Sequence, residues 1–241
     1  MTEKQIILKN HLVNYYAVET RPGAAKTAIF LHGWRSNGMI WMPVVKLMSE
    51  QDYSIYCLDL PGFGKSEFPQ KPFHLKDYAE IVKEFIVKLE LAGGHEVSVI
   101  GHSFGGRVAI KLGALHPHLV KKLVLADCGG FRKAEWKRGL TTFFAKILGP
   151  AFALPLLRTL RPRIYNILGA DDYLATPELK NTFINIINED LLEIAPKVVT
   201  QTLIIWGRND QEVPLQFGRK MHGLIPSSKF LVLESAGHFS F

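Results

Sequence analysis

Short apolar runs alternate along the chain with longer segments in which apolar residues recur at helical spacing. Runs of four to seven residues are typical of buried strands, and they predict strands over residues 13–18, 27–31, 54–58, 97–100, 120–126, 203–206 and 230–233. The helical spacing is clearest from Leu75 to Leu89 and from Val108 to Leu115. This order of elements predicts an α/β fold with a mostly parallel, doubly wound sheet that carries helices on both faces.

The alternation of strands and helices stops between residues 131 and 195. Helical spacing continues there, but prolines interrupt it at positions 150, 155, 162 and 177. We therefore predict one α/β core, formed by residues 1–130 and 196–241, with an inserted helical cap, or lid, over residues 131–195. The longest apolar run, from Leu140 to Leu157, contains Lys146 and two prolines, so it is a poor candidate for a membrane span.

Composition adds a local excess of positive charge to this picture. The 241 residues are 47% hydrophobic and 21% charged, which suits one globular domain and excludes a disordered chain. Residues 132–163 hold eight basic side chains and one acidic one, a net +7 that equals the formal charge of the whole chain. We interpret this charge as a solvated face. The alternatives are attraction of anionic substrates and weak association with an anionic membrane surface.

Several classes of protein are not expected from these residues. The two cysteines, Cys57 and Cys128, have no metal-ligand spacing and form no disulfide framework, and the first residues lack the pattern of a secretory signal. These features predict a soluble, cytoplasmic protein. No group of His, Asp, Glu or Cys has the spacing of a metal site, so no metal is expected. Nucleic acid is not an expected partner, because no binding motif accompanies the basic segment.

The segment with the clearest chemistry is Gly101-His102-Ser103-Phe104-Gly105. It lies between a predicted strand and a predicted helix, where a sharp turn lifts a serine hydroxyl above the edge of the sheet. The two glycines leave room for so tight a turn. An incidental serine in a glycine-rich turn is the plainer alternative, but the strand and helix on either side favour Ser103 as a nucleophile.

A serine nucleophile needs a base, and the base needs a carboxylate that fixes its tautomer. His238 follows the last predicted strand and is the best candidate for the base, whereas His102 is expected to point away from its neighbour Ser103. Asp210 follows the penultimate predicted strand. Asp127 is its rival, but the chain order of serine, aspartate and histidine favours Asp210. A loop carboxylate that binds nearby backbone amides is the expected role of Asp127.

Acyl transfer also needs donors for the oxyanion that develops on the attacked carbonyl. The backbone amide of Phe104 is one candidate, because this residue follows the nucleophile. The second candidate is the amide of Trp34 in His32-Gly33-Trp34, which follows an early strand. These donors, together with the three side chains, predict a serine hydrolase.

The predicted cap offers apolar side chains for a substrate pocket. Phe143, Phe144 and Leu148 are candidates for its lining, and they predict short- to medium-chain acyl groups. Packing of the same side chains between cap and core is the alternative. Arg107, one helical turn after Ser103, is expected to form a helix-surface salt bridge rather than to bind a substrate carboxylate.

Five segments of the chain stand in the order typical of the α/β-hydrolase superfamily, which this chain resembles over nearly its whole length. They are His32-Gly33-Trp34, residues 59–66, residues 101–106, residues 207–210 and Gly237-His238. Within the superfamily the chain is similar to the cap-bearing bacterial carboxylesterases. The resemblance implies cofactor-free cleavage of a small-molecule carboxylic ester through an acyl-serine intermediate.

The fold hosts several chemistries, so two alternatives accompany this hypothesis. One is a carbon–carbon bond hydrolase or lyase with the same triad, and the other is a ligand receptor with slow turnover. The sequence ends three residues after His238, whereas members of the superfamily usually continue into a final helix. Either the sequence is cut short, or the loop that carries His238 is anchored in another way.

Overall fold

The computed structural model describes residues 1–18, 26–48, 52–92, 96–131 and 176–241. Most of the predicted cap lies outside these residues. The three cap side chains proposed for the pocket, Phe143, Phe144 and Leu148, and the basic segment 132–163 are therefore still predictions.

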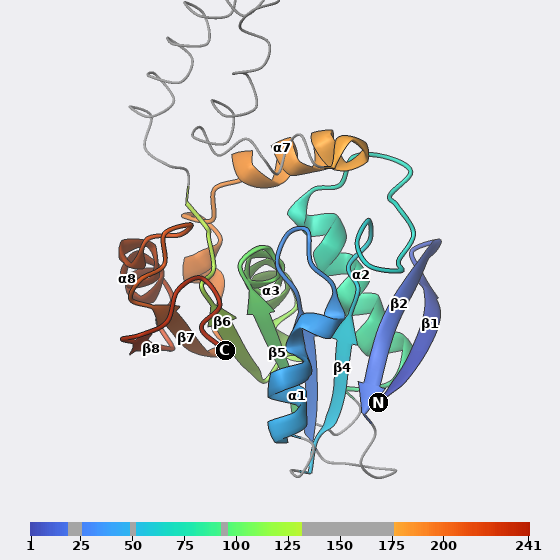
Figure 1. Cartoon of the computed structure of the whole chain (residues 1–241), viewed down its shortest axis with the longest axis horizontal. Coiled ribbons are helices and arrows are strands. Elements are labelled where there is room, and N and C mark those ends of the chain that lie inside the picture. Colours follow the sequence, from blue (N-terminus) through green and yellow to red (C-terminus); the bar gives the residue numbers. More distant parts are fainter. Residues whose placement is uncertain (19–25, 49–51, 93–95, 132–175) are drawn as a thin grey trace, which may run out of the picture.

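The structure is built on one eight-stranded sheet with the order β1-β2-β4-β3-β5-β6-β7-β8 (Figure 1). The strands are β1 (Thr2–Leu8), β2 (His11–Val18), β3 (Lys26–Leu31), β4 (Ser54–Leu58), β5 (Glu96–His102), β6 (Lys122–Ala126), β7 (Gln201–Gly207) and β8 (Ser228–Leu233). The pairs β1–β2 and β2–β4 are antiparallel, and the other five pairs are parallel. The prediction of a mostly parallel sheet is confirmed.

One strand, β1, was not predicted from the sequence. It is an edge strand, and its apolar residues are only the last three, Ile6-Ile7-Leu8, a run too short to predict a strand by itself. It forms a hairpin with β2 that is closed by the pair Leu8 and His11, and this pairing holds β1 in the sheet although its own residues do not indicate a strand.

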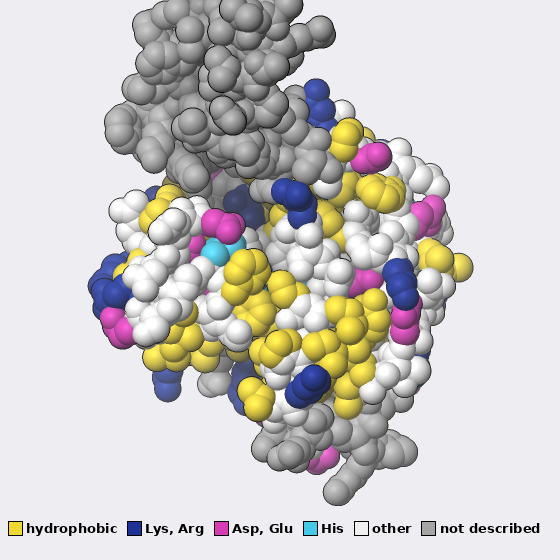
Figure 2. Space-filling view, in the orientation of Figure 1, with side chains coloured by type: hydrophobic (Ala, Val, Ile, Leu, Met, Phe, Trp, Pro, Cys, Tyr) yellow, Lys and Arg dark blue, Asp and Glu magenta, His cyan; other side chains and the backbone are white. Residues whose placement is uncertain are grey.

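Helices cover both faces of the sheet, as the predicted doubly wound arrangement requires (Figure 1). The helices are α1 (Met42–Met48), α2 (Leu75–Lys88), α3 (Phe104–Leu115), α7 (Lys180–Asn188) and α8 (Leu215–Leu224), with short 3-10 turns η1 (Gly38–Trp41), η2 (Pro117–Leu119), η5 (Pro177–Leu179) and η6 (Ala195–Lys197). The apolar side chains of α2, α3 and α8 join the main core. On the opposite face α1 packs over a smaller cluster with Phe30, Trp41 and Cys57, and apolar side chains gather around it (Figure 2).

The register of the parallel strands brings their carboxyl ends to one edge. Gly101 in β5 pairs with Leu31 in β3, His102 pairs with Ala126 in β6, and Ala126 pairs with Ile205 in β7. The loops that follow these strands therefore open at the same end of the sheet, which is the usual place for a site in this class of fold. Helix α7 lies above this edge in Figure 1. In the described segments no helix combines the length and the apolar character needed to cross a membrane.

The packing of α2 on the sheet can be tested at Phe85. Its side chain is fully buried, and its ring lies edge-on to Tyr15 at 5.1 Å between centroids. We expect Phe85→Ala to lower the free energy of unfolding by about 3 to 5 kcal/mol, because the cavity is surrounded by packed strands. Val87→Ala, on the exposed face of the same helix, is the matched control and should change it by less than about 0.5 kcal/mol. Urea unfolding followed by circular dichroism measures both. Equal effects of the two changes would contradict this packing.

Candidate active site

Ser103 occupies the sharp turn between β5 and α3. Its φ of 48° and ψ of −110° lie in a region that residues with side chains avoid. A Cβ on Gly101 would lie 2.4 Å from the carbonyl oxygen of Gly105, and a Cβ on Gly105 would lie 2.3 Å from that of Leu31. Only glycine fits at either position, so the sequence Gly-x-Ser-x-Gly is what permits this turn. The amide of Ser103 donates to Ala126 O at 3.0 Å, which ties the turn to β6.

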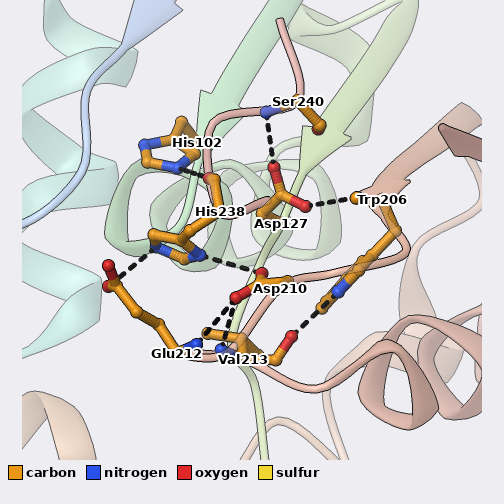
Figure 3. A network of polar contacts seen from close by, with 9 residues as sticks. His102, Asp127, Trp206, Asp210, Glu212, Val213, His238 and Ser240 are labelled. Carbon is orange, nitrogen blue, oxygen red and sulfur yellow. Dashed lines mark hydrogen bonds and ion pairs between the residues drawn. The ribbon is translucent and has the colours of Figure 1, made fainter. Parts of the chain in front are cut away.

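His238 and Asp210 meet beside this turn. The Nδ1 atom of His238 lies 2.9 Å from Oδ2 of Asp210, and both side chains are buried (Figure 3). A carboxylate can only accept, so Nδ1 carries the hydrogen and Nε2 of the neutral ring keeps a lone pair. The other oxygen of Asp210 accepts from the amides of Glu212 and Val213 at 2.9 and 2.8 Å. The carboxylate is therefore fixed in the orientation that binds the imidazole.

Asp127, the rival carboxylate, binds backbone amides instead. Its Oδ1 accepts from Gly207 N at 2.8 Å, and its Oδ2 accepts from Ser240 N at 3.0 Å (Figure 3). Burial raises the pKa of Asp127; the two amide bonds oppose this rise, and the negative charge of Asp210 adds to it. This is the role that the sequence favoured for Asp127, a loop carboxylate that holds nearby backbone.

The electrostatic environment shifts the pKa values of His238 and His102 in opposite directions. Burial by itself lowers the pKa of His238, but the hydrogen bond and charge of Asp210, with smaller contributions from Glu212 and Asp127, raise it above the ordinary value. Burial dominates at His102 and lowers its pKa to about 4. The environment thus favours the protonated form of His238, whereas His102 stays neutral near pH 7.

Glu212 is a further partner of His238 that the sequence analysis did not identify. Its Oε2 lies 3.4 Å from Nε2 of His238, and two-thirds of its side chain is exposed. Within the described chain, this contact rather than a hydrogen bond to Ser103 Oγ occupies Nε2. Nothing in the sequence distinguishes Glu212 from other exposed loop acids except its position two residues after Asp210.

The loop after β3 passes directly beside Ser103. A Cβ on Gly33 would lie 2.8 Å from Nδ1 of the buried His102 ring and 3.5 Å from Cβ of Ser103, so the His102 ring leaves room only for glycine here. His32 orients this loop. Its Nε2 accepts from Leu60 N at 3.0 Å, so Nδ1 carries the hydrogen and donates to Gly33 O at 2.7 Å. In a trans peptide the N–H of Trp34 points opposite to Gly33 O, and therefore away from His32. Trp34 was predicted from the sequence as a donor, but the role of His32 in orienting the Gly33–Trp34 peptide was not.

Three phenylalanine rings pack around the indole of Trp34 in this loop. The ring of Trp34 lies edge-on to Phe63 at 4.8 Å and to Phe104 at 5.4 Å, and it lies 5.1 Å from Phe183 of α7. Trp34, Phe63, Phe104 and Phe183 are called the aromatic wall below. Phe63 and Phe183 were not predicted, because they come from a loop and a helix that only the folded chain brings together.

The prediction of a salt bridge for Arg107 is wrong. Its Nη2 donates to the carbonyl oxygen of Ile186 at 2.7 Å and to that of Glu189. The last carbonyls of a helix have no partner within the helix, and Arg107 supplies one at the end of α7. The neighbouring Lys111 forms the ion pair, with the carboxylate of Glu189 at 2.6 Å. The two side chains attach α7 to α3.

Known proteins similar to this chain include hydrolases of different chemistry. Residues 28–241 match the profile described as the alpha/beta hydrolase family. A pimeloyl-[acyl-carrier protein] methyl ester esterase of Pseudoalteromonas atlantica is 38% identical over 150 residues, covering 61% of this chain and 53% of the relative. A 2-hydroxy-6-oxononadienedioate/2-hydroxy-6-oxononatrienedioate hydrolase of Escherichia coli is 26% identical over 241 residues, covering 89% and 81%. A solved esterase from Exiguobacterium antarcticum has a TM-score of 0.76 at 22% identity, covering 99% of this chain and 93% of its own.

The contact of Glu212 with His238 predicts a change in the titration of the imidazole. A nearby anion stabilises the protonated ring, so Glu212→Gln should lower the pKa of His238. An exposed ion pair contributes roughly 0.2–1 kcal/mol, which corresponds to about 0.2 to 0.7 of a pH unit. An NMR titration of the His238 ring resonances measures the shift.

The control for this titration is Glu96→Gln, which removes the same charge at the opposite end of β5. It should leave the His238 titration unchanged. An unaltered pKa in Glu212→Gln, or an equal decrease in both variants, would argue against a specific contact.

Proposed function

Because the chain belongs to the alpha/beta hydrolase family and is a hydrolase, we propose that it is a serine carboxylesterase that cleaves short- to medium-chain esters. The observation that carries the proposal is the 2.9 Å bond between His238 and Asp210 beside the strained turn of Ser103. In this proposal Ser103 is the nucleophile, His238 the base and Asp210 the acid that fixes the tautomer of the base.

The chemistry follows from the protonation of each group. Nδ1 of His238 is committed to Asp210, so Nε2 accepts the proton of Ser103 Oγ as the oxygen attacks the ester carbonyl. The oxyanion is stabilised by the amides of Phe104 and Trp34. His238 then gives its proton to the leaving alcohol. The imidazole next activates water, which releases the acid from Ser103.

Glu212 bears on the first step of this sequence. Nε2 of the neutral ring has a lone pair and forms no hydrogen bond with the carboxylate of Glu212, so this contact is favourable only when the ring is protonated. Glu212 is largely exposed, so its side chain can move away from the ring into solvent at little cost. Catalytic hydrogen bonds are often long or misaligned until substrate is bound.

The aromatic wall supports an uncharged acyl group as the substrate. Its four rings, three phenyl groups and the indole of Trp34, carry no charge, and Arg107, the cation one turn after Ser103, already donates to two backbone carbonyls. The Pseudoalteromonas relative is named for the cleavage of a methyl ester. These observations favour an ester over the dienedioate for which the Escherichia relative is named.

A panel of substrates distinguishes the esterase from the two alternative functions. A carbon–carbon bond hydrolase would turn over a vinylogous diketone acid faster than p-nitrophenyl esters of two to eight carbons. A ligand receptor would release about one equivalent of product per chain and then stop. We expect steady turnover of the esters with an optimum at short or medium acyl length, measured by release of p-nitrophenol.

Replacement of the nucleophile tests the proposal. Ser103→Ala should lower kcat for p-nitrophenyl butyrate by at least about 10³-fold and abolish labelling by a fluorophosphonate, because it removes the hydroxyl that forms the acyl intermediate. Ser98→Ala, in the same strand, is the control and should keep wild-type activity and labelling. Circular dichroism confirms that both variants fold. A wild-type rate in folded Ser103→Ala would rule out this mechanism.

A further inference from the structure

The segment that carries His238 has no regular structure of its own. After β8, residues 234–241 form a turn and an extended stretch without helix or strand. Up to Ala236 this segment is held by the end of β7, because Asn209 N donates to Ala236 O at 2.9 Å and Arg208 N donates to Leu233 O at 3.0 Å. From residue 237 onward it is held by the ring of Phe241, which lies 4.1 Å from that of Trp41 between centroids, and by hydrogen bonds from side chains at the ends of other strands.

The first of these bonds comes from His102. Its Nε2 lies 2.8 Å from the carbonyl oxygen of His238, and a carbonyl can only accept, so Nε2 carries the hydrogen (Figure 3). The His102 ring is buried and stays neutral near pH 7, which preserves this donor. His102 directly precedes Ser103. The bond therefore joins the side chain of the nucleophile's neighbour to the backbone carbonyl of His238.

The second bond comes from Asp127, which follows β6. Its Oδ2 accepts from Ser240 N, while its Oδ1 accepts from Gly207 N at the end of β7. Asp127 is fully buried, and its φ of 47° is one that side chains rarely adopt. A buried carboxylate is costly unless its oxygens are hydrogen-bonded, and here backbone amides of two separate segments satisfy them. The carboxylate thus bridges β7 and the His238 segment.

We propose that His102 and Asp127 are positioning residues that hold the backbone on either side of the His238 side chain, one at residue 238 and one at residue 240. Together with Asp210 on the imidazole, they fix the base from three adjacent strand ends, β5, β6 and β7. This inference rests on the proposed function, in which His238 is the base. A displacement of about 1 Å at a reacting group can cost roughly 10²-fold in rate, so the anchors act on kcat.

His102 offers a test with a matched rescue. The amide nitrogen of glutamine is as many bonds from Cα as Nε2 of histidine, whereas that of asparagine is one bond closer. We expect His102→Asn to lower kcat for p-nitrophenyl butyrate by roughly 10- to 100-fold with KM within about twofold, and His102→Gln to recover most of the loss. The exposed His118→Asn is the control for loss of a histidine and should behave as wild type.

Asp127→Asn tests the second anchor. The amide keeps one acceptor but turns the other into a donor that faces an N–H, so one of the two backbone bonds is lost. A loss of kcat of the same order is expected, again with little change in KM. If both anchors hold the same segment, the double variant His102→Asn/Asp127→Asn should lose less than the product of the two single losses.

The measurements separate positioning from simple destabilisation. Titration with a fluorophosphonate counts competent sites, so kcat is expressed per folded molecule. The low-field NMR resonance of the proton in the His238–Asp210 bond reports the geometry of the base. We expect this resonance to broaden or shift in His102→Asn and to return in His102→Gln.

Two results would overturn the positioning role. One is a wild-type kcat per competent site in both His102→Asn and Asp127→Asn, with an unchanged resonance. The other is a loss of kcat in His102→Asn that His102→Gln does not recover. These results leave the proposed function intact if Ser103→Ala is inactive. An active Ser103→Ala instead overturns the proposed function and, with it, this inference.

Discussion

Ser103 holds a backbone conformation that residues with side chains avoid, and its neighbours supply the contacts that keep it there. A residue in such a region costs on the order of 1–3 kcal/mol. The turn is held by the bond from Ser103 N to Ala126 O, by the start of α3, and by the contact of Gly105 with the backbone of Leu31. Each contact comes from a central strand of the sheet or the helix packed on it. The position of the hydroxyl therefore depends on the register of β3, β5 and β6, and so do the positions of the loops around it.

Three histidines lie at this edge, and their environments give them different properties. His32 and His102 are buried, and burial lowers the pKa of each to about 4, so both are neutral near pH 7. His32 orients the peptide of Gly33, and His102 donates to the carbonyl of His238. Only His238, beside Asp210, has a raised pKa. Two imidazoles are thus fixed hydrogen-bonding groups, and one is suited to exchange protons, a separation typical of sites that use acid and base chemistry.

The sequence predicted those parts of the structure that local patterns encode. Seven of the eight strands follow from apolar runs, and β1 was missed because its apolar run of three residues is too short to predict a strand. The sharp turn at Ser103 could be predicted because its glycines and its strand-to-helix context are contiguous. The roles of His32, His102, Glu212 and Phe183 could not, because each depends on a contact across the fold. The spacing between His102 and His238 is 136 residues, and no local pattern indicates which atom of one faces the other.

The two buried aspartates at this edge show why Asp210 rather than Asp127 is free to bind the imidazole. Both oxygens of Asp127 accept from backbone amides that join β7 to the His238 segment, so neither is available to an imidazole without breaking that junction. In Asp210 a single oxygen takes both backbone amides of its own loop, and the second oxygen remains for Nδ1 of His238. The two carboxylates therefore differ in how many of their oxygens bind backbone amides: both in Asp127, and only Oδ1 in Asp210. An acid at position 127 that served the imidazole would have to release Gly207 or Ser240, and the segment that positions the imidazole would lose its support.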